Sequence, residues 1–143
     1  MGKYQLILRE EYLGTMAIVL MMFIFSIFTA IGILVIKKKL HDRKERIATI
    51  IICIILILMM LGIGSYETMT ALKIKQDMEN NLFITYFGEY ELVYDRTFTI
   101  CYIHDNDNDI YIELRCISRP QSGSYTGYVV YSKNSLYVVD IYE

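Results

Sequence analysis

The hydrophobic positions of this chain are concentrated in two long blocks. Residues 15–36 read TMAIVLMMFIFSIFTAIGILVI and residues 47–64 read IATIIICIILILMMLGIG, and neither block contains a charged side chain. A 22-residue helix spans about 33 Å, close to the hydrocarbon thickness of a bilayer. A core helix of a soluble protein would show a polar face every 3.6 residues, and neither block does. The pattern predicts transmembrane helices at 15–36 and, extended by Ser65 and Tyr66, at 47–66.

The segment between the two blocks is strongly basic. Its lysines and arginines are Lys37, Lys38, Lys39, Arg43, Lys44 and Arg46. Short loops rich in these residues stay on the cytoplasmic side of a membrane. We therefore expect residues 37–46 to form a cytoplasmic loop, with these six side chains determining the orientation. The protein is predicted to be a multi-pass protein of the cell membrane whose short tail, 1–14, and C-terminal part are both extracytoplasmic.

The residues that follow the second block keep a helical pattern. Met69, Leu72 and Met78 give residues 67–81 a loose apolar stripe at helical spacing. We expect this segment to be a juxtamembrane helical stalk, in which the second helix continues beyond the bilayer. An amphipathic segment lying on the membrane surface is the alternative.

From Leu82 onward the pattern changes to that of β-structure. The segment is rich in Tyr, Ile, Val, Phe and Thr, which favour pleated strands. Turn-forming residues divide it into six predicted strands, at Leu82–Phe87, Tyr90–Tyr94, Thr97–His104, Ile110–Ile117, Tyr125–Tyr131 and Leu136–Tyr142. The connections are too short for parallel crossovers, so an antiparallel meander is expected. The fold class is thus an α+β membrane protein: a two-helix hairpin followed by a small antiparallel β domain, 82–143.

Two cysteines of this domain are candidates for a disulfide bond. Cys101 and Cys116 lie on consecutive predicted strands, and their Cβ atoms would be near bonding distance if they were directly opposed. Closing a loop of this length stabilises a fold by about 3 kcal/mol. Because a domain of this size has a thin core and lies in an oxidising compartment in this topology, we expect the bond.

Charge and motifs exclude several classes of function. Net charge is −2, but residues 81–143 carry nine acidic and four basic side chains, so no basic stripe for nucleic acid exists there. We expect no cofactor, no metal site and no enzymatic activity, because no nucleophile–base pair, zinc spacing or phosphate loop is recognisable. The turn Asp105–Asp109 begins like a calcium loop, but Ile110 and Cys116 occupy the positions that need Gly and Glu. A polar hairpin turn is the favoured interpretation, and weak calcium binding is the alternative.

The tyrosines give the clearest indication of function. Ten of the 13 follow residue 85, and tyrosine is favoured at recognition surfaces because it combines area, rigidity and a polar tip. Tyrosine also fills small sheets, which is the competing interpretation. We expect an exposed binding patch that includes Tyr111, Tyr125, Tyr128, Tyr131 and Tyr137.

These observations favour a membrane-anchored extracytoplasmic module that contacts or blocks a protein or cell-wall partner. The residue usage suggests a bacterial origin, for which a role as an immunity-type or envelope accessory protein would fit. The alternative is an integral small subunit of a larger membrane transport or secretion complex.

Overall fold

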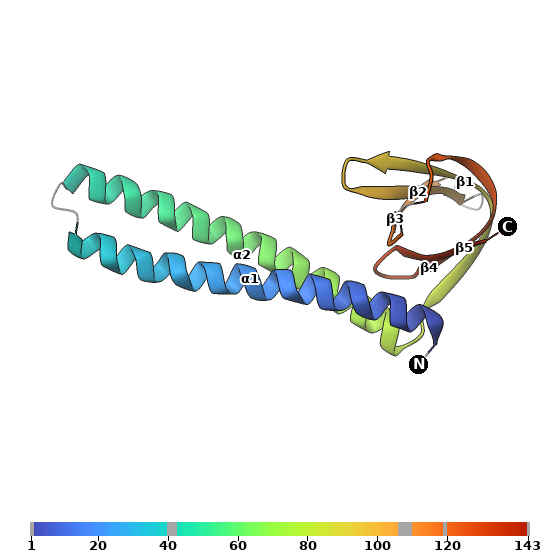
Figure 1. Ribbon diagram of the computed structural model, residues 1–143, viewed down its shortest axis with the longest axis horizontal. Helices are drawn as coiled ribbons and strands as arrows, with labels where there is room; N and C mark the ends of the chain where they lie inside the picture. The colour runs from blue at the N-terminus through green and yellow to red at the C-terminus, as the bar shows by residue number, and fades with distance from the viewer. Residues whose placement is uncertain (1, 40–42, 106–109, 119, 143) are drawn as a thin grey trace. The chain divides into compact units, whose positions relative to one another are not determined.

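The computed structural model describes residues 2–39, 43–105, 110–118 and 120–142, and it is an α+β protein (Figure 1). Two long helices are followed by five strands. The contacts divide the chain into two compact units. One unit comprises Leu13–Ala71, and the other comprises Met1–Tyr12 together with Leu72–Glu143. The two ends of the helical hairpin therefore belong to the same unit as the strands.

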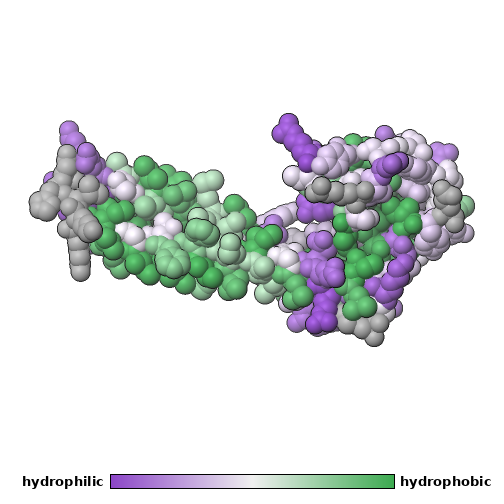
Figure 2. Space-filling model, viewed as in Figure 1, coloured by the Kyte–Doolittle hydropathy of each residue, from purple (hydrophilic) through white to green (hydrophobic). Residues whose placement is uncertain are grey.

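The two helices carry the apolar blocks. Helix α1 runs from Lys3 to Lys39 and helix α2 from Arg43 to Glu79, and each has 37 residues, or about 55 Å of length. Both are long and apolar enough to span a membrane, and almost nothing in their most apolar windows is buried. Apolar residues cover most of the visible surface along the middle of the helical hairpin (Figure 2). The expected tail at 1–14 is helical from Lys3, and α2 runs through the expected stalk without a break.

Polar groups within the apolar hairpin are satisfied locally. Ser26 Oγ donates to the carbonyl of Met22 at 2.9 Å, and Thr29 Oγ1 donates to that of Phe25 at 2.8 Å. Across the hairpin, Ser26 Oγ lies 4.0 Å from Met60 Sδ. Side-chain hydroxyls that bond the preceding turn carry little cost in an apolar environment.

The strands form a small closed barrel in the order β1-β2-β3-β5-β4. Their bounds are Phe83–Asp95 for β1, Phe98–Asp105 for β2, Ile110–Cys116 for β3, Gly123–Ser132 for β4 and Tyr137–Tyr142 for β5. Most neighbours are antiparallel, but β3 and β5 pair in parallel at Arg115↔Tyr137 and Cys116↔Val138. The predicted antiparallel meander is therefore wrong. The chain leaves β3 to pair β4 with β1, and β5 then returns between β4 and β3.

The first two predicted strands are one continuous strand in the structure. Gly88 and Glu89, predicted as a turn, pair with Gly127 and Thr126 of β4, so the ladder passes through them. The Tyr86 ring lies over Gly88, where an added Cβ would come within 2.8 Å of the Tyr86 ring carbon Cζ. The Tyr86 hydroxyl then donates to the Glu89 carbonyl at 3.1 Å. Gly88 thus makes room for a tyrosine inside the barrel, as glycines covered by an aromatic ring do in curved sheets.

Two separate apolar clusters stabilise the barrel unit. The first fills the barrel interior and is formed by Tyr90, Leu92, Cys101, Ile103, Leu114, Cys116, Val129, Tyr131 and Val138. The second lies outside the barrel, where the helix ends cover β4 and β5; its buried members are Leu8, Ile74, Val130, Tyr137 and Val139. In β5, Val138 pairs with Tyr131 and Asp140 with Val130, so Val139 is an extra residue in a bulge. This bulge places Val139 in the outer cluster.

The end of α2 is fastened to the β4–β5 turn by a buried carboxylate. Asp77 is fully buried, and its oxygens accept bonds from the backbone N–H groups of Asn134, at 3.0 and 3.1 Å, and Ser135, at 2.7 Å. The Asn134 amide and the Ser135 hydroxyl each donate a further bond at 2.7 Å. Asn81 and Leu136, with φ values of 53° and 59°, end the helix and the turn. These donors compensate for the lost hydration of the Asp77 carboxylate.

Replacing Asp77 should therefore destabilise the barrel unit. We expect Asp77→Ala to lower the free energy of unfolding by about 3 kcal/mol, because several half-buried donors lose a charged acceptor. Thermal unfolding of the full chain in maltoside micelles, followed by the near-ultraviolet circular dichroism of the tyrosines, measures the change. Glu79→Ala, at an exposed position two residues along, is the matched control. Equal effects of the two substitutions would contradict this role of Asp77.

One polar atom inside the barrel lacks a partner. Thr99 is fully buried, and its Oγ1 has no hydrogen bond in the described part of the chain. We expect Thr99→Val, which keeps the shape of the side chain, to raise the free energy of unfolding by about 1 kcal/mol. The same measurement on Thr126→Val, at an exposed position of β4, is the control. Destabilisation by Thr99→Val would show that the hydroxyl is satisfied in solution.

Candidate functional site

The five tyrosines predicted to bind a partner do not form one patch. Tyr111, Tyr125 and Tyr128 are exposed, with relative accessibilities of 70%, 36% and 37%. Tyr131 lies in the interior cluster and Tyr137 in the outer cluster, and both are buried. Tyr131 and Tyr137 are therefore packing residues and are not available at the surface.

Three aromatic side chains form a ladder across the outer face of the barrel. Phe87 of β1 pairs with Tyr128 of β4, which pairs with Tyr142 of β5. The ring centroids are 4.6 Å apart for Phe87 and Tyr128, and 5.0 Å apart for Tyr128 and Tyr142. Phe87 is 64% exposed and Tyr142 is 44% exposed. We call these three residues the aromatic ladder; it belongs to neither apolar cluster of the barrel unit.

The sequence contains only part of the information needed to find this ladder. Phe87 and Tyr142 were not among the predicted site residues, although strand alternation places Phe87 on the face opposite Tyr86 and Gly88. The missing information is the pairing of β1 with β4, two strands that are far apart in the sequence.

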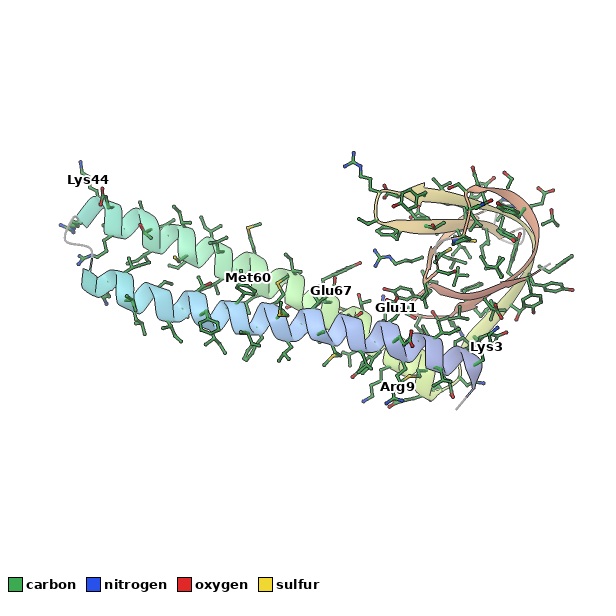
Figure 3. The ribbon with its side chains drawn as sticks, viewed as in Figure 1. Lys3, Arg9, Glu11, Lys44, Met60 and Glu67 are labelled. Carbon is green, nitrogen blue, oxygen red and sulfur yellow. The ribbon has the colours of Figure 1, made fainter. Side chains whose placement is uncertain are left out.

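A cavity of about 760 Å³ opens where β5 runs beyond its short pairing with β3. Its walls include Tyr90 and Tyr125, whose rings stack with centroids 5.8 Å apart. Lys3, at the start of α1 (Figure 3), forms an ion pair with Asp140 at 2.8 Å on the rim of this cavity. The hydrogen bond and charge of Asp140 raise the pKa of Lys3 above its usual value. Lys3 is exposed, so the ion pair contributes little to stability.

A second, smaller cavity lies where β1 and β2 separate, and it has a volume of about 240 Å³. Pairing between the two strands ends at Tyr90↔Ile103. The cavity is lined by two glutamates, three tyrosines, a histidine and a serine: Glu89, Tyr90, Glu91, Tyr102, His104, Tyr111 and Ser124. The walls of this cavity are thus acidic and aromatic.

The two barrel cysteines are free thiols in the structure. Cys101 pairs with Leu114 and Cys116 pairs with Thr99, so they occupy diagonal positions of the β2–β3 ladder. The directly opposed register on which the expected disulfide depended is wrong by two residues. Both side chains point into the barrel. Burial, with a smaller contribution from Cys116, raises the pKa of Cys101 to about 12, and burial raises that of Cys116 to about 11.

These raised pKa values predict slow thiol chemistry. At pH 8 the thiolate fraction would be about one in ten thousand for Cys101 and about one in a thousand for Cys116, and only the thiolate reacts readily. In a Cys53→Ser background, iodoacetamide should leave both thiols unmodified in the native protein and alkylate both after denaturation. Rapid native alkylation, or a reductant-sensitive mobility shift, would contradict the buried free thiols.

The same shifts give a dependence of stability on pH. Both pKa values are higher in the folded state than the ordinary value of 9.0. The folded state therefore holds the two thiol protons more tightly than the unfolded state does. Where the folded state binds more protons than the unfolded state, the free energy of unfolding decreases as the pH rises. We expect this contribution to be fully present below pH 9 and to be lost as the pH rises through 11 and 12. A Cys101→Ala/Cys116→Ala variant should show a weaker alkaline decline in unfolding temperature.

The basic residues expected to set the orientation lie at the adjoining ends of the two helices. Lys37 is exposed in the last turns of α1, and Arg43 and Lys44 are exposed at the start of α2. Arg46 follows in the same turn and is half-buried. Lys38 and Lys39 end α1, and residues 40–42 of the expected loop lie outside the described residues.

The described residues contain no cluster of three or more His, Cys, Asp or Glu side chains that could hold a metal ion. The turn Asp105–Asp109, whose sequence begins like a calcium loop, lies mostly outside the described residues, because residues 106–109 are not described.

Comparison of the chain with protein-family models, with curated proteins and with solved structures gives no match. A proposal of function therefore depends on the geometry of the described residues.

Proposed function

We propose that this protein is a membrane-anchored binding module whose barrel captures or blocks a protein partner outside the cytoplasm. The aromatic ladder of Phe87, Tyr128 and Tyr142 is the observation that carries the proposal. Its rings are exposed, contact one another and pack into neither cluster of the barrel unit. Clustered aromatic side chains at the centre of a surface patch are typical anchors of protein interfaces. A role of the immunity or envelope-accessory type fits such a module.

The helical hairpin supports the membrane part of the proposal. Leucine, isoleucine and phenylalanine side chains are exposed along both helices, including Leu20, Phe28 and Leu58 at 59%, 67% and 63%. An exposed apolar surface of this extent is typical of contact with lipid or with another protein. Together with the basic side chains at the adjoining helix ends, it supports two membrane crossings with the connecting loop in the cytoplasm.

The orientation can be tested with single introduced cysteines. In a Cys53→Ser background, we expect a membrane-impermeant maleimide to label Ser122→Cys in intact cells, because Ser122 is exposed on the barrel unit. Lys37→Cys should be labelled only after permeabilisation. Cys101 and Cys116 contribute little background, because burial raises the pKa of both thiols. The reverse labelling pattern would place the barrel in the cytoplasm.

Site-specific photo-crosslinking tests the role of the ladder. A benzophenone amino acid at position 87 of the full chain, in its native cells, should give a discrete adduct, whereas the same group at Ser122 should not. Tyr128→Ser/Tyr142→Ser should reduce the adduct at least about tenfold, which corresponds to the loss of an anchor worth about 1.4 kcal/mol or more. Equal adducts at both positions, or no effect of the double substitution, would contradict the proposal.

The alternative, an integral subunit of a larger membrane complex, predicts a different dependence. Replacing residues 15–64 with an unrelated apolar hairpin keeps the helix ends that belong to the barrel unit. The adduct at position 87 should survive this replacement if the helices serve as an anchor. Its loss, with the barrel still folded, would favour the subunit.

A further inference from the structure

The smaller cavity of the barrel unit has a distinctive chemical character. Glu89 and Glu91 of β1 line it together with Tyr102 and His104 of β2 and Tyr111 of β3. Glu91 pairs with Tyr102, and His104 pairs with Tyr111. The His104 and Tyr111 rings contact each other at a centroid distance of 4.8 Å. At about 240 Å³ the cavity is smaller than the usual site for a drug-sized ligand, and it suits a single side chain or a small ion.

The two carboxylates in this cavity have no partner among the residues that the structure describes. Neither the Glu89 nor the Glu91 carboxylate has a hydrogen bond or an ion pair with any residue in the described part of the chain. The nearest basic side chain along β3, Arg115, lies over the Phe98 ring at 4.2 Å and reaches the Tyr137 hydroxyl at 3.5 Å. The negative charge of the cavity is therefore not neutralised by this neighbour.

Carboxylates beside aromatic faces form a site for an organic cation. A lysine or arginine head group gains both from the ion pair and from the electron-rich ring faces. A metal ion is disfavoured: His104 also lines the cavity, but the described residues contain no group of three His, Cys, Asp or Glu side chains that could hold a metal ion. The excess of acidic over basic residues in this part of the sequence would attract a basic partner.

The cavity lies beside the aromatic ladder, although no ladder residue lines it. Phe87, Glu89 and Glu91 occupy alternate positions of β1, so all three side chains project from the same face of the strand, about 7 Å apart at each step. Glu89 pairs across to Thr126, the outward-facing residue next to Tyr128 on β4. A partner that covers the ladder would thus extend naturally over the cavity.

We propose that this cavity binds a lysine or arginine side chain of the protein partner, next to the apolar contact made by the ladder. The proposal rests on the proposed binding function and specifies the chemistry of the partner: an apolar anchor segment flanked by a basic residue. Interfaces of this kind gain orientation and association rate from the charged contact.

The test uses the full chain in maltoside micelles, which contain no quaternary ammonium group. The probe is a fluorescein-labelled Ala-Lys-Ala-Lys-Ala peptide, and its binding is followed by fluorescence anisotropy against the Ala-Glu-Ala-Glu-Ala analogue. We expect saturable binding of the lysine peptide alone. Glu89→Gln/Glu91→Gln should weaken it at least about tenfold, and Tyr111→Leu about threefold.

Three controls make the result specific. Glu79→Gln/Asp95→Asn removes the same charge from exposed positions outside the cavity and should change the affinity less than about twofold. Ser122→Ala should leave peptide binding unchanged, since Ser122 is exposed and does not line the cavity. Choline is added as a competitor, and displacement of the peptide by millimolar choline would assign the site to a lipid head group and overturn the proposal.

Failure of this inference is distinguishable from failure of the proposed function. Absence of saturable binding, or equal losses in the cavity and control variants, overturns the cationic site. If the crosslink at position 87 persists under those conditions, the binding module stands without this contact. Loss of the crosslink in Glu89→Gln/Glu91→Gln, with the ladder intact, supports the basic residue in the partner.

Discussion

The Asp77 carboxylate holds the end of α2 against the turn between β4 and β5, and the arrangement of the barrel depends on this contact. A fully buried charge is tolerated only where donors surround it, and here Asn134 and Ser135 supply them from both backbone and side chain. The outer apolar cluster forms around the same junction. There Leu8 of α1 and Ile74 of α2 pack against Val130 and Val139. The helix ends are thereby structural parts of the barrel unit.

This junction changes the boundary of the β domain. A fragment beginning at Leu82 would lose Leu8, Ile74 and the acceptor of the turn, and it would expose Val130 and Tyr137 to water. A barrel of this size has little stability to spare. The minimal folded unit therefore includes the first turns of α1 and the last turns of α2, which a replacement of residues 15–64 keeps intact.

The sequence predicts the local elements well and the long-range pairing poorly. Uncharged length identifies both apolar helices, and strand composition and turn residues locate β2 to β5 to within a few residues. The turn predicted at Gly88-Glu89 is wrong, because both residues pair with β4. Gly88 leaves space for the ring of Tyr86 inside the barrel. The parallel β3–β5 pair and the register of Cys101 and Cys116 depend on strand pairings that alternation alone does not specify.

The tyrosines illustrate the same limit at the candidate site. Alternation separates the two faces of a strand, but here the interior of the barrel and part of its exterior are both buried. Tyr131 is buried in the interior cluster, and Tyr137 is buried in the outer cluster. Tyr128 remains outside with Phe87 and Tyr142, because the helix ends cover the β4–β5 surface only in part. The surface that stays uncovered is aromatic and, beside it, acidic.

Hydrogen exchange at the β4–β5 turn tests the role of the helix ends most directly. An ordinary surface turn exchanges its amide protons quickly, whereas donors to a buried carboxylate exchange only when the surrounding structure opens. In the full chain in micelles, the amides of Asn134 and Ser135 should be protected nearly as strongly as that of Val129 in the barrel interior. Rapid exchange at Asn134 and Ser135 beside a protected Val129 would show that the barrel folds without the helix ends and would contradict the account.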